Sequence, residues 1–338
     1  MERIELSQAD VHGMMTSGEA LAWARKAVNK VELSEREEAF GKMIDEQVNQ
    51  VWKYGNAMAK SHIAEIIVKI IEPEVFDVPM ELLNQIFDQG SIGEFDDIKF
   101  ESKWINGLVA KQSAIRTGNV EKTYLGVMDS KREITNLEIA TEFPMSELRK
   151  PNGLGVAELS LYALEAFNNA KYRFLLNFIE NKVVPAGANF SGAISEATIE
   201  PFLGYLYDNN DSATYSQVVG LSNQIRKVSK TAKNSAFYTD EMKDVLNREA
   251  KLQVLDNALL VPIKAGRKDG TGQTLIPDKK LYGFAGKVGQ VFNRGELRVY
   301  VTENPNTEVF DVLFKGVEFG VAVYPEQERK IAIYTVSE

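Results

Sequence analysis

Cysteine is absent from the 338-residue sequence, and histidine occurs only twice. Without cysteine the chain has no disulfide bond, no thiolate metal site and no cysteine nucleophile, so its stability has to come from packing. The two histidines, His12 and His62, form no spaced pair of metal ligands, and the Ser-His-Ile-Ala-Glu context of His62 is no metalloprotease motif. We therefore interpret both as surface or lightly packed side chains.

Basic residues are in deficit, and long apolar runs are missing. Asp and Glu outnumber Lys and Arg by 48 to 39, which gives a net charge of −9. This balance argues against a dedicated nucleic-acid-binding protein, because phosphate contacts need a basic surface. A protein that encloses nucleic acid without binding it tightly is still compatible with this charge. No apolar run approaches the roughly 20 residues of a membrane span, and the charged N-terminus is no secretory signal.

The motifs of well-known catalytic and binding sites are missing as well. The glycine-rich segment 266–274 lacks the spacing of a Walker phosphate loop, and Gly153-Leu-Gly155 lacks the third glycine of a dinucleotide site. The acidic segments 94–97 and 208–211 could offer oxygen ligands to a cation, but they lack the twelve-residue pattern of an EF-hand. We interpret these two segments as solvated turns, and we predict no catalytic, cofactor-binding or metal site.

A long helix pattern is the most informative feature that is present. Residues 155–182 carry apolar side chains at steps of three and four, with charged residues between them. The apolar positions are Leu159, Leu161, Leu164, Phe167, Phe174, Leu175 and Phe178, and the charged ones are Glu158, Glu165, Lys171 and Arg173. The pattern ends at Val184-Pro185, because proline disfavours a helical conformation in the preceding residue. At 1.5 Å per residue the helix spans about 40 Å, so it needs a large surface to lie on.

Residues 1–95 predict a series of charged helices. Ser34 and Glu37 fit a capping box at the start of one of them. Helical patterns cover residues 17–31, 34–52, 63–71 and 78–87, the third ending at Glu72-Pro73. Each has one narrow apolar face, too little for a core of its own, so we expect these helices to pack on another domain or another subunit.

A charged β-ribbon follows the helices. A turn at 91–95 precedes strand-like alternation in residues 97–104, 122–128 and 132–143, and residues 106–120 form a polar tip. A two-stranded ribbon with charges on both faces is not stable alone in water. We therefore expect the ribbon to lie on a neighbour.

The segment after the long helix is mixed, with helices first and strands later. The predicted helices cover residues 198–207, 214–228 and 239–246, each with a Ser or Thr start. The predicted strands cover residues 257–263, 296–302, 309–313, 317–323 and 330–336. Residues 264–273 between them predict a glycine-rich surface loop, and Asn304-Pro-Asn a turn.

The order of these segments resembles that of the major capsid proteins of tailed bacteriophages, the Hong Kong 97 fold. Residues 132–148, which end in Phe-Pro-Met-Ser-Glu-Leu, are similar to the family's strand returning from its extended loop and to the turn before its spine helix. Residues 296–323, which end in Phe-Gly-Val-Ala-Val, look like the long strands of its peripheral domain. The resemblance implies an α+β fold with an N-terminal helical arm, an extended β-hairpin loop, a peripheral domain with a long spine helix, and an axial domain.

The resemblance also implies a division of the chain into these parts. The arm would reach under or across a neighbour, the loop would lie over the adjacent subunit, and the axial domain would surround the five- and six-fold axes. The implied ranges are 1–95 for the arm, 96–143 for the loop, 144–196 with 288–323 for the peripheral domain, 197–287 for the axial domain and 324–338 for a terminal strand.

The function that the resemblance implies is structural and not enzymatic. The chain would be a head protein that assembles as pentamers and hexamers into an icosahedral shell around phage double-stranded DNA, in the virion, after assembly in the host bacterial cytoplasm. Its implied partners are other copies of itself, scaffolding, portal and decoration proteins, and DNA in weak non-specific contact, but no membrane. Because only about 95 residues precede the ribbon, we expect no cleaved scaffolding segment. No pair of Lys and Asn side chains can be assigned to a covalent cross-link.

Two alternatives stay open. An encapsulin-like nanocompartment would have the same fold but would store an enzyme in place of a genome. A carboxylate-dependent hydrolase could use pairs among Asp129, Glu142 and Glu147. Such a hydrolase would be a monomer or small oligomer with a deep pocket, whereas either shell protein would form large closed assemblies.

Overall fold

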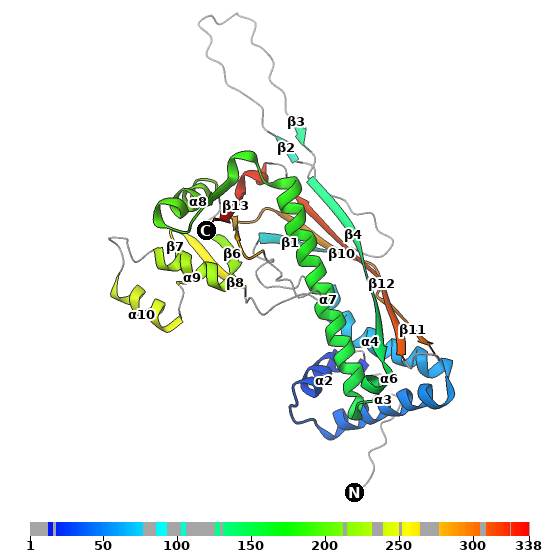
Figure 1. Ribbon diagram of the computed structural model, residues 1–338. Helices are drawn as coiled ribbons and strands as arrows, with labels where there is room; N and C mark the ends of the chain where they lie inside the picture. The colour runs from blue at the N-terminus through cyan, green and yellow to red at the C-terminus, as the bar shows by residue number, and fades with distance from the viewer. Residues whose placement is uncertain are drawn as a thin grey trace, which may run out of the picture.

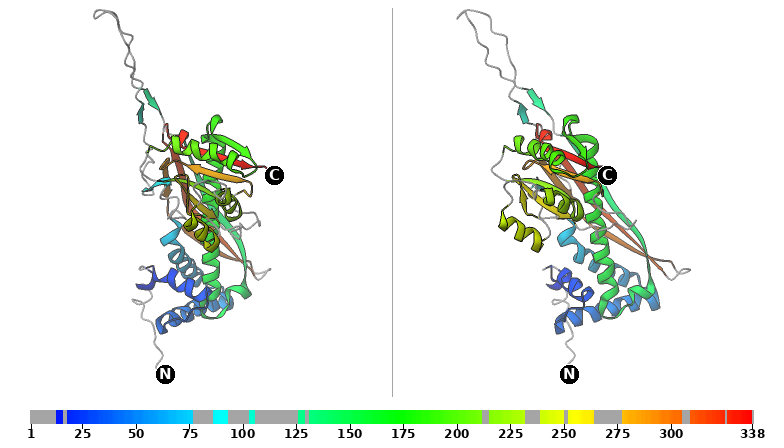
Figure 2. Two further views of the ribbon diagram at one scale, coloured as in Figure 1. Left: turned by 90° about the vertical axis from the view of Figure 1, so that its left-hand side faces the viewer. Right: turned by 60° about the vertical axis from the view of Figure 1, so that its left-hand side comes forward.

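The computed structural model describes residues 13–15, 18–76, 86–92, 103–105, 126–128, 131–211, 215–231, 239–249, 252–263, 277–304, 309–324 and 326–337. These residues form an elongated body in which one long helix, α7 (Leu154–Phe178), runs beside two β-sheets (Figure 1). The N-terminal helices gather at one end of α7, and the C-terminal strand lies toward its other end (Figure 2). This mixture of helices and sheets confirms the predicted α+β class.

The first sheet is organised around its longest strand, β12 (Val309–Val323). On one side, β4 (Lys131–Pro144) runs antiparallel along the length of β12. The other side is shared by β11 (Arg298–Asn304), which pairs with the first half of β12, and β10 (Gly289–Arg294), which pairs with the second half. At the far edge β1 (Phe87–Ile92) lies parallel to β10. The sheet is therefore a long plate with β4 along one border.

A bulge interrupts β12 where the pairing with β11 gives way to the pairing with β10. The register of β12 shifts between Phe314 and Val317. Gly295 and Gly316 have φ of 106° and 89° at this place. A Cβ on Gly295 would lie 2.1 Å from the carbonyl oxygen of Gly316, and one on Gly316 would lie 2.1 Å from that of Glu296. Only glycine fits so close a backbone contact with a positive φ.

The second sheet has six strands in the order β5-β13-β9-β6-β8-β7. Its strands are β5 (Asn189–Gly192), β6 (Ser216–Leu221), β7 (Val254–Leu255), β8 (Ala258–Ile263), β9 (Lys280–Phe284) and β13 (Ile331–Val336). One face, with Val219 and Tyr282, packs toward the end of α7. The opposite face, with Val218 and Tyr334, is covered by α8 (Glu196–Asp208) and α9 (Ser222–Thr231), and α10 (Asp240–Glu249) lies beyond them.

Helix α7 buries apolar side chains in two successive cores. Val156 and Phe167 from its first half pack with the N-terminal helices and with the first half of β12. Leu175 and Phe178 from its last turns pack between the two sheets. A π-helical turn, Ile179–Val183, then ends the helix before Pro185, where the sequence predicts the stop. The helix therefore ties both sheets and the N-terminal helices into one body.

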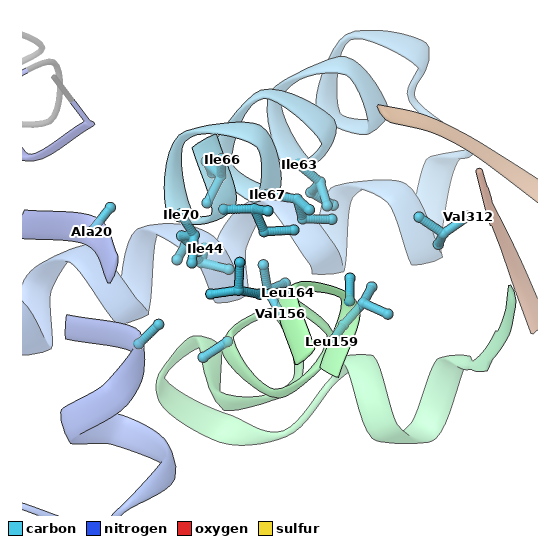
Figure 3. Packing of buried hydrophobic residues seen from close by; sticks show 14 of the residues in the cluster. Ala20, Ile44, Ile63, Ile66, Ile67, Ile70, Val156, Leu159, Leu164 and Val312 are labelled. Atoms are coloured by element: carbon cyan, nitrogen blue, oxygen red, sulfur yellow. The ribbon is translucent and has the colours of Figure 1, made fainter. Parts of the chain in front are cut away.

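Three N-terminal helices close the first core. These are α2 (Glu19–Val28), α3 (Glu35–Tyr54) and α4 (Ala57–Val75). Their apolar residues meet Val156, Leu159 and Leu164 of α7 (Figure 3). The predicted capping box of α3 is confirmed, because the Ser34 hydroxyl accepts from the Glu37 N–H at 3.3 Å and the Glu37 carboxylate accepts from the Ser34 N–H at 2.8 Å. The expectation that these helices pack on another domain is thus met within the chain.

Several predicted boundaries are wrong, each for a local reason. Helix α4 continues to Val75 through Pro73, because a proline in the last turn forfeits only its own N–H. Phe87, predicted as helical, and Ser91, predicted as a turn, both belong to strand β1. The predicted helix 214–228 is strand β6 followed by α9, because all six β6 residues are buried between helices and the rest of the body.

The ribbon prediction needs a correction for its last strand. The sequence analysis expects residues 132–143 to lie on a neighbour, but β4 pairs with β12 of its own chain. The two strands predicted at 309–313 and 317–323 are one strand, β12. Helices predicted at 198–207 and 239–246 are confirmed as α8 and α10, and the strands at 257–263 and 330–336 as β8 and β13. Strands β5, β9 and β10 are missing from the sequence analysis.

Candidate assembly surfaces

The start of α7 is held on α3 by direct backbone contact. Strand β4 leads through α6 (Met145–Leu148), which confirms the predicted turn, into a 3-10 turn at Pro151–Gly153. The Asp45 carboxylate of α3 accepts the N–H of Asn152 at 2.7 Å and that of Gly153 at 2.8 Å. A Cβ on Gly41, one turn before Asp45, would lie 2.5 Å from the Asn152 carbonyl oxygen. Gly41 and Gly153 therefore serve the junction between these two helices.

Lys171 is buried in the middle of α7, although the sequence pattern assigns it to the charged positions. It is 1% exposed, and its ammonium group donates a hydrogen bond to the carbonyl oxygen of Val75, the last residue of α4. The same ammonium group lies 5.8 Å from the centre of the Phe319 ring. A cation is favourable at a helix C-terminus, where the carbonyl groups point outward. Lys171 thus links α4, α7 and the first sheet.

The face of the first sheet that points away from α7 is exposed and carries mixed side chains. Along β4, residues alternate between the half-buried side and this exposed side. Ala140, Leu313 and Tyr300 stand in one row across β4, β12 and β11, and Tyr300 is 50% exposed. Near the other end of β4, Ile134 is 46% exposed. Such apolar positions on a sheet face are suited to contact with another protein surface.

The border of this sheet at β4 is a second candidate contact. Among the described strands, β4 pairs only with β12. Its other side runs for 14 residues, from Lys131 to Pro144. An open strand edge presents unpaired N–H and C=O groups, and proteins either protect it or use it to bind another strand.

The two strands β2 (Lys103–Ile105) and β3 (Gly126–Met128) form a small sheet of their own. It stands beyond the end of the body, on the side away from the N-terminal helices (Figures 1 and 2). A two-stranded sheet is marginal in water without a further surface to pack on. The ribbon therefore projects toward space that another molecule can occupy.

The turn between α3 and α4 also exposes apolar side chains. Tyr54 is 78% exposed at the end of α3, and Met58 is 69% exposed at the start of α4. Trp52, two residues before Tyr54, is half-buried, with the Arg149 guanidinium 5.3 Å from its ring centre. Trp23, in contrast, is fully buried against Phe40 within its own chain.

Two of the carboxylates considered for a hydrolase, Glu142 and Glu147, lie in different surroundings. Glu142 lies on the exposed side of β4, whereas Glu147 in α6 pairs with Lys150 at 2.6 Å. Lys150 also pairs with Glu158 at 2.6 Å, and these two carboxylates raise the pKa of its ammonium group above the usual range. Asp129 lies outside the described residues. Glu147 therefore belongs to an ion-pair cluster at the start of the spine helix.

His62 and the acidic turn 208–211 both lie on the surface. His62 is an exposed side chain whose ring nitrogen lies 3.4 Å from the Gln47 side-chain oxygen, as predicted for a surface histidine. In the turn 208–211, Asp211 pairs with Arg329 at 3.1 Å and Lys330 at 3.3 Å, and these cations lower its pKa. His12, Trp104's side chain and the segments 94–97, 106–120 and 264–274 lie outside the described residues.

A hollow of about 210 Å³ lies where α2, α4 and α7 meet. Its lining includes Arg25, Glu74, Leu161, Leu164, Glu165, Asn168, Asn169 and Tyr172. The hollow has two carboxylates in its lining, Glu74 and Glu165. Glu74 forms an ion pair with Arg25 at 2.5 Å. None of these residues is a serine or a histidine, and neither Glu142 nor Glu147 lines the hollow.

In the described part of the chain, no three His, Cys, Asp or Glu side chains gather where they could hold a metal ion. No described helix combines the length and apolar character that a membrane crossing requires.

Comparisons with known proteins give likenesses of structure only. No family model and no curated protein matches the sequence. A solved structure of Gordonia phage Cozz covers 76% of this chain and 86% of its own, at 13% identity and a TM-score of 0.46. The capsid of an empty GTA particle covers 76% and 90%, at 12% identity and a TM-score of 0.47. A virus-like particle from Pyrococcus furiosus covers 80% and 98%, at 11% identity and a TM-score of 0.43.

The order of the described elements follows the order predicted from the sequence resemblance. N-terminal helices come first, then the small ribbon, the long strand β4, the short turn α6, the spine helix α7, and a mixed segment. The long strands β11 and β12 and the terminal strand β13 close the chain. The described residues form a helix-and-sheet body with exposed sheet surfaces.

Proposed function

We propose that this chain is a major capsid protein, a structural subunit that assembles as pentamers and hexamers into an icosahedral shell around phage double-stranded DNA. The observation that carries this proposal is the β2–β3 ribbon, which stands beyond the body and pairs only with itself among the described strands. A ribbon of this kind gains stability only when another molecule covers it. A subunit that depends on its neighbours for this burial is built for assembly.

The body suits a shell subunit for mechanical reasons. Helix α7 and strands β4 and β12 have 25, 14 and 15 residues, and the helix packs along the strands. These long elements give the subunit a fixed shape and extended surfaces for contact. We assign no enzymatic activity to the chain.

The roles of the segments follow the sequence resemblance. Residues 1–95 are the arm region, of which 19–75 are anchored on the chain's own spine helix. Residues 96–143 are the extended loop, and its last strand is anchored by β12. Residues 144–196 with 288–323 form the peripheral domain, and 197–287 form the axial domain. The last segment, 324–338, supplies the strand β13 to the sheet of the axial domain.

The partners follow from the shell function. Other copies of this chain cover the ribbon and the exposed sheet face, and scaffolding, portal and decoration proteins act during or after assembly. DNA inside the shell makes weak non-specific contacts, in keeping with a net charge of −9. The assembled protein belongs in the virion, after assembly in the bacterial host.

Two other functions make different predictions. An encapsulin-like compartment would form closed shells with a protein cargo and no nucleic acid. A hydrolase would form a small particle at every concentration, and its activity would depend on a pair among Asp129, Glu142 and Glu147.

Negative-stain electron microscopy of the purified full-length chain, with sedimentation alongside, tests the proposal. Closed shells, tubes or capsomer rings support it, and DNA that is protected from nuclease within shells isolated from infected cells separates a genome capsid from a cargo compartment. A uniform small particle at every salt and protein concentration, with or without co-expressed phage assembly proteins, would refute it.

A further inference from the structure

Helices α8 and α9 cover the same face of the six-stranded sheet. Helix α8 begins beside β5 and crosses the sheet as far as β8, and the Ser216 hydroxyl of β6 donates to the Leu206 carbonyl oxygen near the end of the helix. Phe202 of α8 packs against Phe190 of β5 and Tyr334 of β13, at one edge of the sheet. Helix α9 packs over β6 and β8, on the other side of β9. Ile225 and Val228 are the residues through which it joins the shared apolar core. Each helix turns its remaining side chains outward.

The outward face of α8 is acidic. Glu196 and Glu200 are exposed one turn apart, over the β5 end of the sheet, and Asp208 is exposed at the end of the helix. No lysine or arginine occurs between Glu196 and Asp208. Within the described part of the chain these three carboxylates make no ion pair.

The outward face of α9 is basic. Arg226, Lys227 and Lys230 are exposed, and no acidic residue occurs in this helix. Among the described residues these three cations have no carboxylate partner. Most other described cations of this acidic chain are paired, for example Lys280 with Glu180 at 2.7 Å. The concentration of three unpaired cations on one helix is therefore a distinct feature of the surface.

We propose that the acidic face of α8 binds the basic face of α9 on a neighbouring copy of this chain. Two α8 faces or two α9 faces would repel each other, so an α8 face meets an α9 face. We take the contact as heterologous, with each copy using one face toward each neighbour, because a reciprocal pair of α8–α9 contacts would close into a dimer and not a ring. Heterologous contacts between identical subunits close into rings when the rotation between neighbours allows it. This inference deepens the proposed function, on which it rests: it identifies the contact that carries one subunit to the next around a pentamer or hexamer.

Opposite charges on the two helix faces give direction to the association. They steer the acidic α8 face of one copy toward the basic α9 face of another, and they disfavour encounters between two α8 faces or two α9 faces. Both faces are exposed, and exposed charges are screened over about 8 Å at 0.15 M salt. Ring formation should therefore weaken as salt rises, while the fold of the subunit stays unchanged.

A charge swap on the full-length chain tests the contact. One variant, Glu196→Lys with Glu200→Lys, makes the α8 face basic. A second, Arg226→Glu with Lys230→Glu, makes the α9 face acidic. The combined variant carries all four substitutions and keeps the net charge of the natural chain. A matched control, Glu241→Lys with Asp244→Lys, reverses two exposed carboxylates of α10.

Each double variant should raise the protein concentration needed for half-maximal assembly at least about tenfold, as like charges then face each other. The combined variant should return to within about threefold of the natural chain. The α10 control should stay within the same range. Circular dichroism melting of each unassembled variant checks that the subunit is folded, and the rescue in the combined variant excludes a folding defect, because such defects would add.

Three outcomes would overturn the inference. The double variants could assemble like the natural chain, the combined variant could fail to recover, or the α10 control could disrupt assembly as strongly as the α8 variant. If the natural chain itself formed no assembly under any condition, the proposed function would fail, which is a separate result. Added DNA could also restore assembly of a double variant while the combined variant fails to assemble. That result would show that the α9 face binds phosphate, and it would overturn the inference.

Discussion

The junction between α3 and the start of α7 predicts a large effect from a single half-exposed residue. Asp45 holds the loop Pro151–Gly153 through two hydrogen bonds from consecutive backbone N–H groups, at 2.7 and 2.8 Å. Asn152 and Gly153 both have positive φ, of 59° and 69°, which turns their N–H groups toward the same carboxylate. Replacing Asp45 by alanine removes both acceptors while the left-handed backbone remains.

The magnitude follows from the two hydrogen bonds. A hydrogen bond to a charged group contributes about 1.5–3 kcal/mol, and the exposed position of Asn152 favours the lower end because water can replace the carboxylate there. We expect Asp45→Ala to lower the free energy of unfolding by about 2–3 kcal/mol, and Asp45→Asn, which keeps one acceptor oxygen, by about half of that. Against a usual total of about 5–15 kcal/mol, this is a large share.

Urea unfolding of the unassembled chain, followed by tryptophan fluorescence, measures the effect. Trp23 reports on the junction itself, because a Cβ placed on Gly153 would lie 3.0 Å from its ring. Glu46→Ala is the matched control, since Glu46 is the exposed neighbour of Asp45, and it should change stability by less than about 0.5 kcal/mol. If Asp45→Ala unfolded at the same urea concentration as Glu46→Ala, the two hydrogen bonds would not hold the junction and the reasoning would be refuted.

Three further predictions concern other parts of the chain. Leu164→Asp should abolish soluble protein, because it places an unpaired carboxylate in the first core, whereas Leu164→Ala should cost about 2–5 kcal/mol and remain soluble; expression and melting curves distinguish them. Deleting residues 105–119 should leave a folded body that cannot close shells, and normal shells from this variant in electron micrographs would contradict the role of the ribbon. Tyr282 has a raised pKa, because it is buried and donates a hydrogen bond to the Glu180 carboxylate. Its neutral form is therefore favoured by folding, so stability should be intact below pH 10 and fall above it, and Tyr282→Phe should flatten this fall in urea unfolding measured from pH 8 to 11.

The features that the sequence predicts best are those encoded by neighbouring residues. The capping box of Ser34 and Glu37 needs only three residues of spacing, and the stop before Pro185 needs only one. The long helix is equally visible, because its period of three and four residues repeats over its whole length. These local signals, taken in order, were sufficient to predict the class of the fold and the candidate ribbon.

The features that the sequence does not reveal depend on residues far apart in the chain. Lys171 is buried only because the end of α4, 96 residues earlier, offers it a carbonyl oxygen. Asp45 bonds to a loop 107 residues later, and a lone aspartate in a helix carries no sign of such a partner. Strand β6 also depends on distant residues. A short apolar run can be a helix or a strand, and the sequence alone does not show that both faces of this run are covered. The acidic and basic helix faces are visible in the sequence, but their positions on one sheet are not.

The paired glycines at the bulge of β12 divide the first sheet into two plates. β11 pairs with β12 before the bulge and β10 pairs with it afterwards, so no ladder on that side crosses Gly316. On the other side, β4 pairs with β12 both before and after the bulge, with a shift of register between Phe314 and Val317, so β4 holds the two plates together. Gly295 and Gly316 therefore mark the line where the two plates meet, and a side chain at either position would push the two halves of the sheet apart.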